Sequence, residues 1–233
     1  MITVSKAKVD KIIEHKDDLR EYFLIPDKYR SFRAGMFLQL SLDLVTASDC
    51  WPESRTFSIA SAHDKSNPCF RLIIRRVGKY TSRIFNELKV GSICTVKYPF
   101  GDLMLPGDDT SEIICIAGGS GIAPFLSFLD ECARNNTLNN MYVFYSAKTE
   151  SEMLYKKLLS ELLGNSYYPF VTREKVEWAK NRRISIDDVI KLTQDSKLNT
   201  QHYYICGSPS FIDYFKKGLR NSGKANVFTD EWE

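Results

Sequence analysis

One uncharged segment limits what this chain can fold into. Residues 113–129 read IICIAGGSGIAPFLSFL, seventeen positions without a charge in a chain that is 26% charged. A membrane-spanning helix needs about 20 apolar residues, and three glycines together with Pro124 would weaken or break such a helix. We therefore predict no membrane span. The segment instead predicts a buried strand over 113–117, a glycine turn, and a helix that begins near Pro124, since proline is favoured in the first helical turn.

Composition narrows the class of protein. The chain has 233 residues, enough for two domains, and its 43% hydrophobic content with only 12 Gly and 8 Pro indicates a folded globular protein. The net charge, 32 − 29 = +3, is too small to indicate a nucleic-acid partner. The N-terminal stretch MITVSKAKVDKII alternates polar and apolar residues and lacks the apolar core of a secretory signal.

The cysteines are scattered. They lie at positions 50, 69, 94, 115, 132 and 206, and no C-x-x-C grouping occurs. This spacing predicts neither a zinc site nor an iron–sulfur centre built from neighbouring cysteines, so no metal site is expected. Free thiols inside apolar runs, such as Cys115 between two isoleucines, are typical of cytoplasmic proteins, and a cytoplasmic location is predicted.

The first hundred residues have the rhythm of short strands. From Phe37 to Leu42, leucines at 38, 40 and 42 share one face. Similar segments and one helix complete the pattern, with strands expected at 2–9, 19–25, 55–61, 70–77 and 92–98 and the helix at 81–88. Short strands at this spacing predict a small antiparallel barrel.

Beyond a predicted linker at 106–111, strands and helices alternate. The expected strand–helix pairs are 112–117 with 124–134, 141–146 with 151–163, 167–172 with 186–193, and 202–206 with 210–220. The second helix is expected to start at the capping-box sequence TESE and to carry Leu154, Leu158 and Leu162 on one face. Such alternation predicts a parallel sheet covered by helices on both faces.

The glycine turn has the residue types of a phosphate site. Glycine allows close approach of the backbone, and a helix N-terminus presents free N–H groups and a partial positive charge. The segment GGSGIAP does not match the G-x-G-x-x-G fingerprint of dinucleotide sites. Taken alone, the motif fits a phosphate site and a tight turn without ligand equally well.

Three further motifs each have a plain structural alternative. RTFSIAS (55–61) combines a cation, an aromatic ring and a hydroxyl, and is also an ordinary strand. GKYTS (78–82) combines a glycine, hydroxyls and a helix start, and is also an ordinary capped helix. YICGSP (204–209) places Cys206 at the carboxyl end of a parallel strand, where open sheets bind ligands, or is simply a buried cysteine before a helix.

Together and in this order, the motifs resemble those of the ferredoxin–NADP⁺ reductase family of flavoproteins. RTFS is similar to its R-x-Y/F-S flavin motif, GKYT to its G-x-x-S/T motif, and YPFG (98–101) to its G-P-x-G motif. AGGSGIAP is similar to its nicotinamide loop and CGSP to its C-G-x-P motif, while the tail VFTDEWE is also family-like. The resemblance covers nearly the whole chain. It implies a flavin-binding antiparallel Greek-key β-barrel over 1–106 and an NAD(P)-binding α/β domain with a parallel sheet over 111–233.

The resemblance also implies residue roles. Arg55 would pair with the flavin phosphate, Phe57 would stack on the isoalloxazine ring, and Ser58 would hydrogen-bond flavin N5. The flavin-binding residues it implies are Arg55, Thr56, Phe57, Ser58, Ser61, Gly78, Lys79, Thr81 and Ser82. The nucleotide-binding residues it implies are Gly119, Ser120, Gly121, Ala123, Pro124, Cys206, Gly207, Ser208 and Pro209. Ser58 and Cys206 would lie beside the reacting atoms and are the implied catalytic residues.

The sequence departs from the family at two positions. Phe57 replaces the commoner tyrosine, so a hydroxyl contact to the ribityl chain is absent and weaker flavin binding is expected. Tyr98 stands where the barrel-end motif has glycine. FAD is the expected flavin, in preference to FMN, and NADPH or NADH is the expected co-substrate. Lys148 and Arg173, with Arg182 and Arg183, are candidates for a 2′-phosphate contact and equally for solvated surface charges.

The expected function is that of a flavin-dependent NAD(P)H oxidoreductase. Hydride would pass from NAD(P)H to FAD, and electrons onward to a ferredoxin, a flavodoxin or an oxygenase component. Basic residues at 71, 75, 76, 79 and 83 would form either a patch that steers an acidic partner or a solvated barrel face. Two alternatives stay open: a free-flavin or ferric-chelate reductase, and a non-catalytic nucleotide-binding electron-transfer scaffold subunit.

Overall fold

The computed structural model describes residues 1–106, 111–194 and 200–229. Residue contacts divide the chain into two compact units. One unit comprises Met1–Met104 and Leu126–Asp130, and the other comprises Leu105–Phe125 and Glu131–Glu233. The predicted linker lies mostly outside the described residues, and the predicted domain limits of 1–106 and 111–233 remain a prediction.

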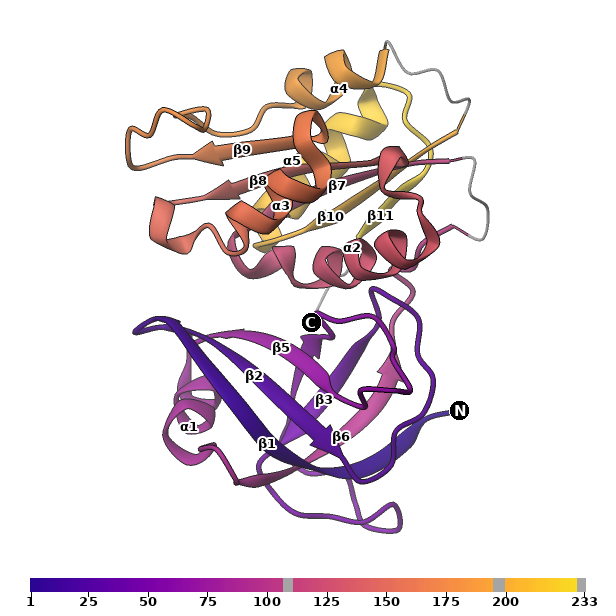
Figure 1. Ribbon diagram of the computed structural model, residues 1–233, viewed down its shortest axis with the longest axis vertical. Helices are drawn as coiled ribbons and strands as arrows, with labels where there is room; N and C mark the ends of the chain where they lie inside the picture. The colour runs from indigo at the N-terminus through magenta and orange to yellow at the C-terminus, as the bar shows by residue number, and fades with distance from the viewer. Residues whose placement is uncertain (107–110, 195–199, 230–233) are drawn as a thin grey trace. The chain divides into compact units, whose positions relative to one another are not determined.

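The first unit contains an antiparallel sheet of six strands (Figure 1). The strands are β1 (Thr3–Lys16), β2 (Leu19–Pro26), β3 (Phe37–Ser41), β4 (Arg55–Ser58), β5 (Phe70–Arg75) and β6 (Ile93–Phe100). Their order is β4-β3-β6-β1-β2-β5, so strands distant in sequence are neighbours, as in a Greek key. A bridge between Ile59 and Leu72 joins the chain after β4 to β5, which brings the two edges together into a nearly closed barrel.

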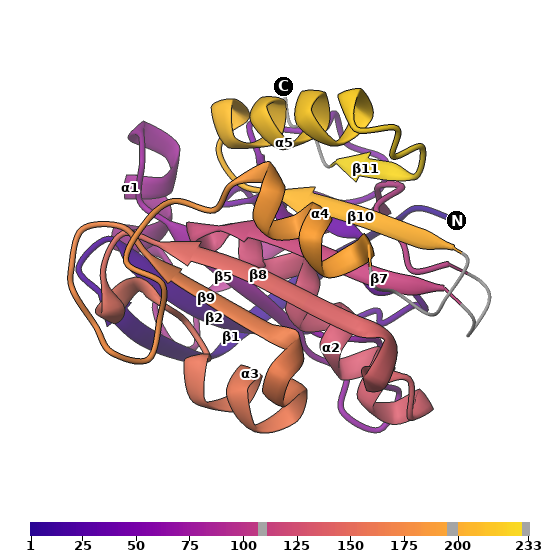
Figure 2. The same ribbon diagram turned by 90° about the horizontal axis from the view of Figure 1, so that it is seen from above.

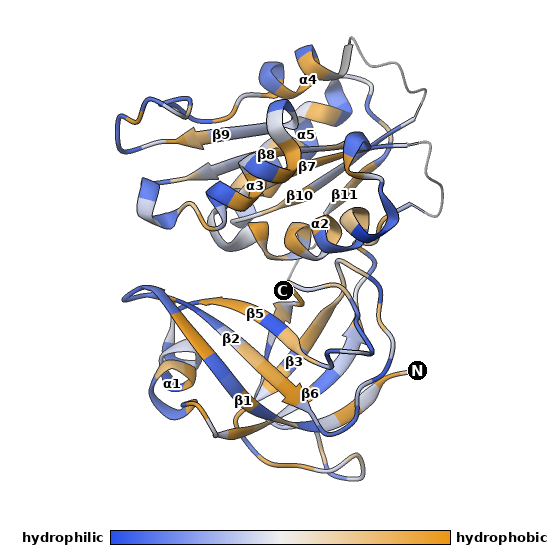
Figure 3. Cartoon of the chain, viewed as in Figure 1, coloured by the Kyte–Doolittle hydropathy of each residue, from blue (hydrophilic) through white to orange (hydrophobic). Residues whose placement is uncertain are grey.

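Alternating side chains make the barrel core. Along β1, buried residues such as Ala7 and Val9 alternate with exposed ones, and hydrophobic and hydrophilic segments alternate on this strand in Figure 3. Tyr98, the residue that departs from the family motif, is fully buried in this core. Its hydroxyl donates to the Lys28 carbonyl at 2.6 Å and accepts from the Arg30 N–H at 2.8 Å. A core tyrosine with both hydrogen bonds satisfied therefore replaces the glycine.

Helix α1 (Lys79–Glu87) follows β5. It starts two residues before the predicted helix and buries Ile84 and Phe85 against the barrel core. The four-residue spacing of Ile84 and Leu88 correctly indicated the buried face, because both side chains belong to the same hydrophobic cluster.

The second unit contains a parallel sheet of five strands in the order β11-β10-β7-β8-β9. The strands are β7 (Glu112–Gly118), β8 (Met141–Ala147), β9 (Tyr167–Val171), β10 (Gln201–Cys206) and β11 (Val227–Thr229). The α-helices are α2 (Ala123–Asn135), α3 (Lys156–Leu163), α4 (Ile186–Gln194) and α5 (Pro209–Asn221). Four short 3₁₀ helices lie among the described residues: η1 (Gly119–Ile122), η2 (Leu138–Asn140), η3 (Glu150–Glu152) and η4 (Gly164–Ser166). Figure 2 shows α2 and α3 on one face of the sheet and α4 and α5 on the other, as the alternation predicted.

The uncharged segment forms strand, turn and helix as predicted. Residues 113–117 are buried in the central strand β7, the glycines form η1, and Pro124 lies in the first turn of α2. Within the described residues, no helix is long and apolar enough to cross a membrane.

The helix predicted at 151–163 is shorter than expected. Thr149 is instead the N-cap of the short helix η3 and makes no side-chain capping hydrogen bond, and Tyr155 then takes a left-handed φ of 57°. Helix α3 begins only at Lys156, so Leu159 and Leu163 face the sheet while Leu162 is 40% exposed. The prediction that Leu154, Leu158 and Leu162 share one helical face was wrong. Tyr155 interrupts the helix, so Leu154 lies outside α3 and cannot share a helical face with the later leucines.

Candidate functional site

Strand β4 presents the RTFS motif at the edge of the barrel sheet. Arg55 is exposed and Thr56, Phe57 and Ser58 are each half-buried, whereas the next residue, Ile59, is fully buried. Phe57 lies opposite Leu38 and packs against the barrel core, and Ser58 lies opposite Phe37. Four accessible side chains in a row are unusual for a barrel strand, which normally buries every second residue. The motif is therefore available to a ligand.

The GKYTS motif forms the start of α1. The hydroxyl of Thr81 accepts the N–H groups of Val77 and Gly78 at 2.9 and 3.0 Å and donates to the Gly78 carbonyl at 3.1 Å. Ser82 makes the first helical hydrogen bond, donating its N–H to Gly78 at 2.9 Å. A side chain added at Gly78 would meet open space. Because the Thr81 hydroxyl is used in the cap, the groups left for a phosphate are the N–H groups of the first turn, which begins at the exposed Lys79.

Tyr80 brings the two barrel motifs together. The Arg55 guanidinium lies over its ring, 4.6 Å from the centroid, and the Arg83 guanidinium lies 5.7 Å from the same centroid. Two cations beside a helix N-terminus form a donor set that fits an anionic pyrophosphate. The sequence had assigned Arg83 only to the suggested basic patch, and Tyr80 had no predicted role although it lies inside the GKYTS motif.

Other charged residues of the barrel are already paired. The Arg71 guanidinium donates to the Ala60 carbonyl and lies 3.6 Å from the buried Glu21 carboxylate. Arg75 forms a 2.7 Å ion pair with Asp18. Only 15% and 19% of these two arginine side chains are exposed, so the suggested basic patch does not include them as free surface charges. Ser61, also expected at the flavin, accepts the Arg71 N–H at 3.4 Å.

The glycine turn of the second unit packs against the end of β10. A Cβ on Gly121 would overlap the Cys206 carbonyl oxygen and lie 2.5 Å from the Cys206 carbonyl carbon and 2.7 Å from the Gly207 nitrogen. Only glycine permits this approach. Gly119 has a left-handed φ of 58° and faces open space. The half-buried Gly119 and Ser120 are accessible, whereas Ala123 and Pro124 are buried behind the turn.

Cys206 and the turn lie where the order of the sheet reverses. From β7 the chain proceeds through α2 to β8 on one side, while β10 lies on the other side of β7. Cys206 pairs with Ala117 in register, is 6% exposed, and is followed by Gly207 and by α5 with Ser208 as N-cap and Pro209 as its first residue. The carboxyl ends of strands at such a switch point are where open α/β sheets bind ligands.

Two of the four candidate cations for a 2′-phosphate lie together. The Arg173 N–H donates to the Lys148 carbonyl at 2.8 Å, and both side chains are exposed beyond the ends of β8 and β9. Arg182 is instead engaged with Asp188 through two hydrogen bonds of 2.6 and 2.5 Å. Arg182 is therefore no longer a candidate for the 2′-phosphate contact. Arg183 is exposed and stays a candidate.

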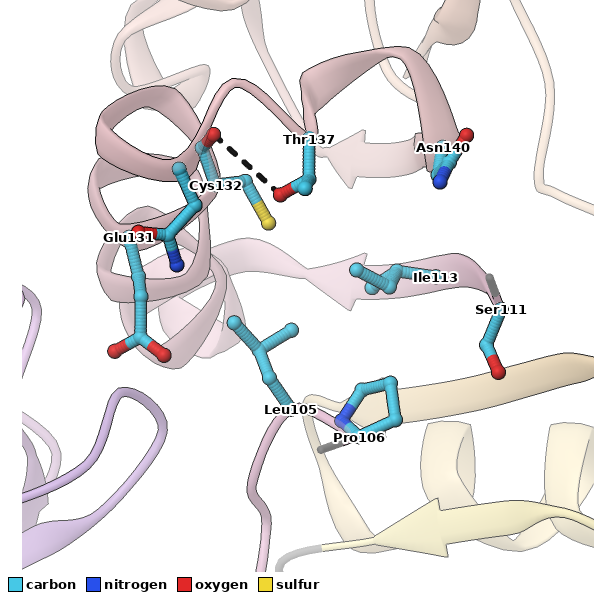
Figure 4. A pocket seen from close by; sticks show the side chains of 9 residues that line it. Leu105, Pro106, Ser111, Ile113, Glu131, Cys132, Thr137 and Asn140 are labelled. Carbon is cyan, nitrogen blue, oxygen red and sulfur yellow. Dashed lines mark hydrogen bonds between the residues drawn. The ribbon is translucent and has the colours of Figure 1, made fainter. Parts of the chain in front are cut away.

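Two hollows in the second unit lie away from the predicted residues. Figure 4 shows a cavity of about 40 Å³ between the start of β7 and the end of α2, where the Thr137 hydroxyl donates to the Cys132 carbonyl at 3.5 Å. That volume holds little more than one water molecule. An open groove of about 360 Å³ runs along the edge of β9 beside Trp178. Neither is at the carboxyl ends of β7 and β10, so the candidate site remains the glycine turn.

Comparisons with known proteins agree with this architecture. Residues 115–217 match the family described as the oxidoreductase NAD-binding domain. Reductase component 1 of terephthalate 1,2-dioxygenase from Comamonas sp is 28% identical over 201 residues, which cover 84% of this chain and 57% of that protein. The reductase component DmpP of phenol 2-monooxygenase from Pseudomonas sp. (strain CF600) is 26% identical over 217 residues, covering 89% and 59%. The chain thus spans little more than half the length of these curated relatives.

A solved structure extends the similarity to the whole chain. The ferredoxin NADP⁺ reductase from Neisseria gonorrhoeae, with bound FAD and NADP, superposes with a TM-score of 0.76 at 20% identity and 98% coverage of both chains. The predicted fold class, an antiparallel barrel followed by a parallel-sheet α/β domain, is confirmed. The resemblance to the ferredoxin–NADP⁺ reductase family is also confirmed, and residues 115–217 match the oxidoreductase NAD-binding domain family.

Proposed function

We propose that the chain is an FAD-dependent NAD(P)H oxidoreductase that passes electrons to an oxygenase component, a ferredoxin or a flavodoxin. The observation that carries the proposal is the stacking of Arg55 on Tyr80 at the start of α1, at 4.6 Å. It joins two motifs that are 23 positions apart in sequence, residues 55 and 78, into one anion site. The match of residues 115–217 to an NAD-binding domain supports a second nucleotide site at the glycine turn.

In this proposal the flavin domain comprises 1–106 and the nucleotide domain 111–233. A bound flavin supplies the hydride-accepting and electron-releasing chemistry. Arg55 and the N–H groups at the start of α1 neutralise its phosphate, Phe57 packs against its ring, and Ser58 offers a hydroxyl hydrogen bond. Gly119 and Gly121 let the backbone approach the dinucleotide, and Cys206 borders the reacting end of the nicotinamide. This chemistry requires no general base.

The terminal electron acceptor is proposed from the relatives. Two of these relatives are named as reductase components of a dioxygenase and a monooxygenase. By analogy with them, an oxygenase component or an electron carrier is our proposed acceptor. A cytoplasmic location is proposed from the six free cysteines.

A free-flavin reductase is the second candidate, favoured by Phe57. Without the tyrosine hydroxyl, the flavin loses one contact and is held more weakly. A yellow protein that retains one FAD per chain through purification would count against this candidate. Reduction of an artificial dye by NAD(P)H would eliminate a non-catalytic scaffold.

The decisive experiment releases and identifies the bound cofactor of the full chain and compares it with an Arg55→Ala variant. Loss of a charged hydrogen bond of about 1.5–3 kcal/mol lowers FAD affinity by roughly tenfold to a hundredfold. Arg75→Ala, which also removes a barrel arginine from an ion pair, is the matched control and should retain flavin. Equal flavin content in wild type and Arg55→Ala would refute the phosphate role.

We propose NADPH as the preferred coenzyme, with NADH as the alternative. The adjacency of Lys148 and Arg173 supports a 2′-phosphate contact. Replacing either by alanine should lower kcat/KM for NADPH by about threefold to tenfold and leave that for NADH unchanged. Lys157→Ala, which removes an exposed lysine that pairs with Glu161 on α3, serves as the control. Similar kcat/KM for NADH and NADPH in the wild type would remove the preference.

A further inference from the structure

Glu53 holds the two cations of the proposed flavin-phosphate site. Its carboxylate lies 3.1 Å from the Arg55 guanidinium and 3.7 Å from that of Arg83. The three side chains are half exposed, at 54% for Glu53, 50% for Arg55 and 44% for Arg83. An anion supplied by the chain itself therefore occupies the guanidinium groups that a phosphate would bind.

The backbone of Glu53 is fixed beside α1. The Tyr80 hydroxyl donates to the Glu53 carbonyl at 2.9 Å, and the Tyr80 ring lies under both guanidinium groups. The hydroxyl of the buried Ser41 donates to the same carbonyl at 2.8 Å. These two bonds tie Glu53 to β3 and to α1, so its carboxylate cannot diffuse far from the site even when it releases Arg55.

We propose that Glu53 competes with the flavin phosphate for Arg55 and Arg83 and thereby sets the affinity of the chain for phosphorylated flavins. The inference rests on the proposed flavin site and deepens it by naming the residue that tunes that site. Arg83, which no family motif includes, becomes a second phosphate-binding cation. The phosphate takes over the guanidinium hydrogen bonds, and the Glu53 carboxylate turns to solvent.

The exposure of the pair makes the exchange feasible. An exposed ion pair stabilises a protein by about 0–1 kcal/mol, so the phosphate displaces the carboxylate at little cost. The displaced carboxylate still lies near the phosphate and repels it by about 1 kcal/mol at 4 Å in water. Neutralising Glu53 should therefore strengthen FAD binding by about threefold to tenfold.

A matched control lies on β1 of the same barrel. The Glu14 carboxylate is 66% exposed and lies 2.6 Å from the Arg20 guanidinium. The change Glu14→Gln removes the same unit of charge and also frees an arginine, but within the described residues Glu14 forms no ion pair with Arg55 or Arg83. Glu87 would not serve as a control, because its carboxylate lies 2.9 Å from the Arg83 Nε. Any effect that depends on net charge alone appears in both Glu53→Gln and Glu14→Gln.

The test is a fluorescence titration of the flavin-free full chain with FAD, FMN and riboflavin. We expect Glu53→Gln to lower the dissociation constants of FAD and FMN by about threefold to tenfold and to leave that of riboflavin, which has no phosphate, unchanged. Glu14→Gln should change each value by less than about twofold. Thermal unfolding of both variants checks that the fold is retained. The variant Glu53→Ala repeats the test without the glutamine amide, which could itself donate a hydrogen bond to the phosphate.

Three outcomes overturn the inference. Weaker FAD binding by Glu53→Gln and Glu53→Ala would mean that Glu53 orients Arg55 for the flavin. Unchanged FAD binding would mean that Glu53 plays no part in flavin affinity. An equal gain in Glu14→Gln, or an equal gain for riboflavin, would mean a general charge effect. If neither wild type nor Glu53→Gln binds FAD, the proposed flavin site fails and the inference with it; if wild type binds FAD and Glu53→Gln gains nothing, only the inference fails.

Discussion

The two units build their candidate anion sites from different parts of the chain. In the barrel, the site consists of side-chain cations, Arg55 and Arg83, held over Tyr80 beside a helix start. In the α/β unit, the turn at 118–121 carries no charge, and its geometry depends on the contact of Gly121 with the end of β10. A site of side chains can be tuned by a neighbouring charge, whereas the backbone contact at Gly121 leaves no room for an added carbon.

Two arginine–carboxylate pairs show the same contrast. Arg55 and Glu53 are both about half exposed and joined at 3.1 Å. The Asp188 carboxylate is only 8% exposed and accepts two bonds from Arg182 and two more from the N–H and hydroxyl of Ser185. The first pair can exchange its partner for a ligand, and the second holds the start of α4. Whether an arginine can bind a ligand therefore depends on the groups that it already pairs with in the folded chain.

The largest expected effect comes from adding one carbon to the backbone-built site. Gly121→Ala should lower the free energy of unfolding by about 2–3 kcal/mol, because the Cβ overlaps backbone atoms of Cys206 that cannot move aside as a side chain would. NAD(P)H oxidation should be lost with it. Chemical denaturation and NAD(P)H-dependent dye reduction measure the two consequences.

The corresponding control is a glycine of the barrel site. Gly78 has an extended φ of −161° and open space around its Cβ position, so Gly78→Ala should cost about 1 kcal/mol or less. Equal destabilisation by the two alanine substitutions would contradict the distinction between the two sites.

An intermediate effect is expected at the structural ion pair. Asp188→Asn should lower the free energy of unfolding by about 1–2 kcal/mol, because it weakens both the helix cap and the pair with Arg182. Hydrogen bonds from Arg182, and after them those from Ser185, hold the pKa of Asp188 below its usual value of 3.8. A lowered pKa in the folded state means that this stabilisation is complete above the unfolded value and is lost as the pH falls below about 3.8.

Denaturation at several pH values checks that prediction. The difference in unfolding free energy between wild type and Asp188→Asn should be constant above about pH 5 and should shrink below pH 4. Asp187→Asn, one position earlier on α4 and outside these hydrogen bonds, is the control. A difference that grows as the pH falls would refute the assigned sign.

The smallest effect is expected in the barrel motif. Phe57→Tyr restores a hydroxyl on a half-buried ring that packs against the barrel core. One additional hydrogen bond of about 0.5–1.5 kcal/mol should tighten FAD binding by about twofold to tenfold without changing stability. Phe23→Tyr on β2, a half-buried ring away from β4, is the control for a hydroxyl added elsewhere. Weaker FAD binding by Phe57→Tyr would show that the phenylalanine is required at this position.

Much of the fold was predictable because its signals are local. Alternation at 37–42 predicted a barrel strand, and the strand–glycine–proline sequence at 113–124 predicted β7, its turn and α2. The start of α3 was mispredicted, because the capping-box sequence at 149–152 has its polar atoms in a 3₁₀ turn instead. A capping box does form at the start of α4, between Ser185 and Asp188, which are three positions apart like residues 149 and 152. Spacing alone therefore did not distinguish the two.

The sequence predicted the motifs of the candidate site but not the ion pairs and hydrogen bonds of its charged residues. The glycine turn and Cys206 meet at the switch point because parallel strands end at the same edge, which the order of motifs implied. The pairing of Arg71 with Glu21, 50 positions away, and the contact of Tyr80 with Glu53 depend on strand and helix packing that no local pattern encodes.

The sequence by itself determined the class of fold, the order of the two units, and the place of the glycine turn between a buried strand and a helix. These features follow from periodicity, glycine and proline, whose effects act over a few residues. The tertiary structure decided which charges are free to bind a ligand. The sequence put forward both Arg55 and Arg182 as phosphate contacts, but Arg55 pairs with an exposed carboxylate and Arg182 with one that folding has buried and capped. The physical reason is that desolvation and hydrogen-bond partners, which exist only after packing, determine whether an ion pair can be exchanged.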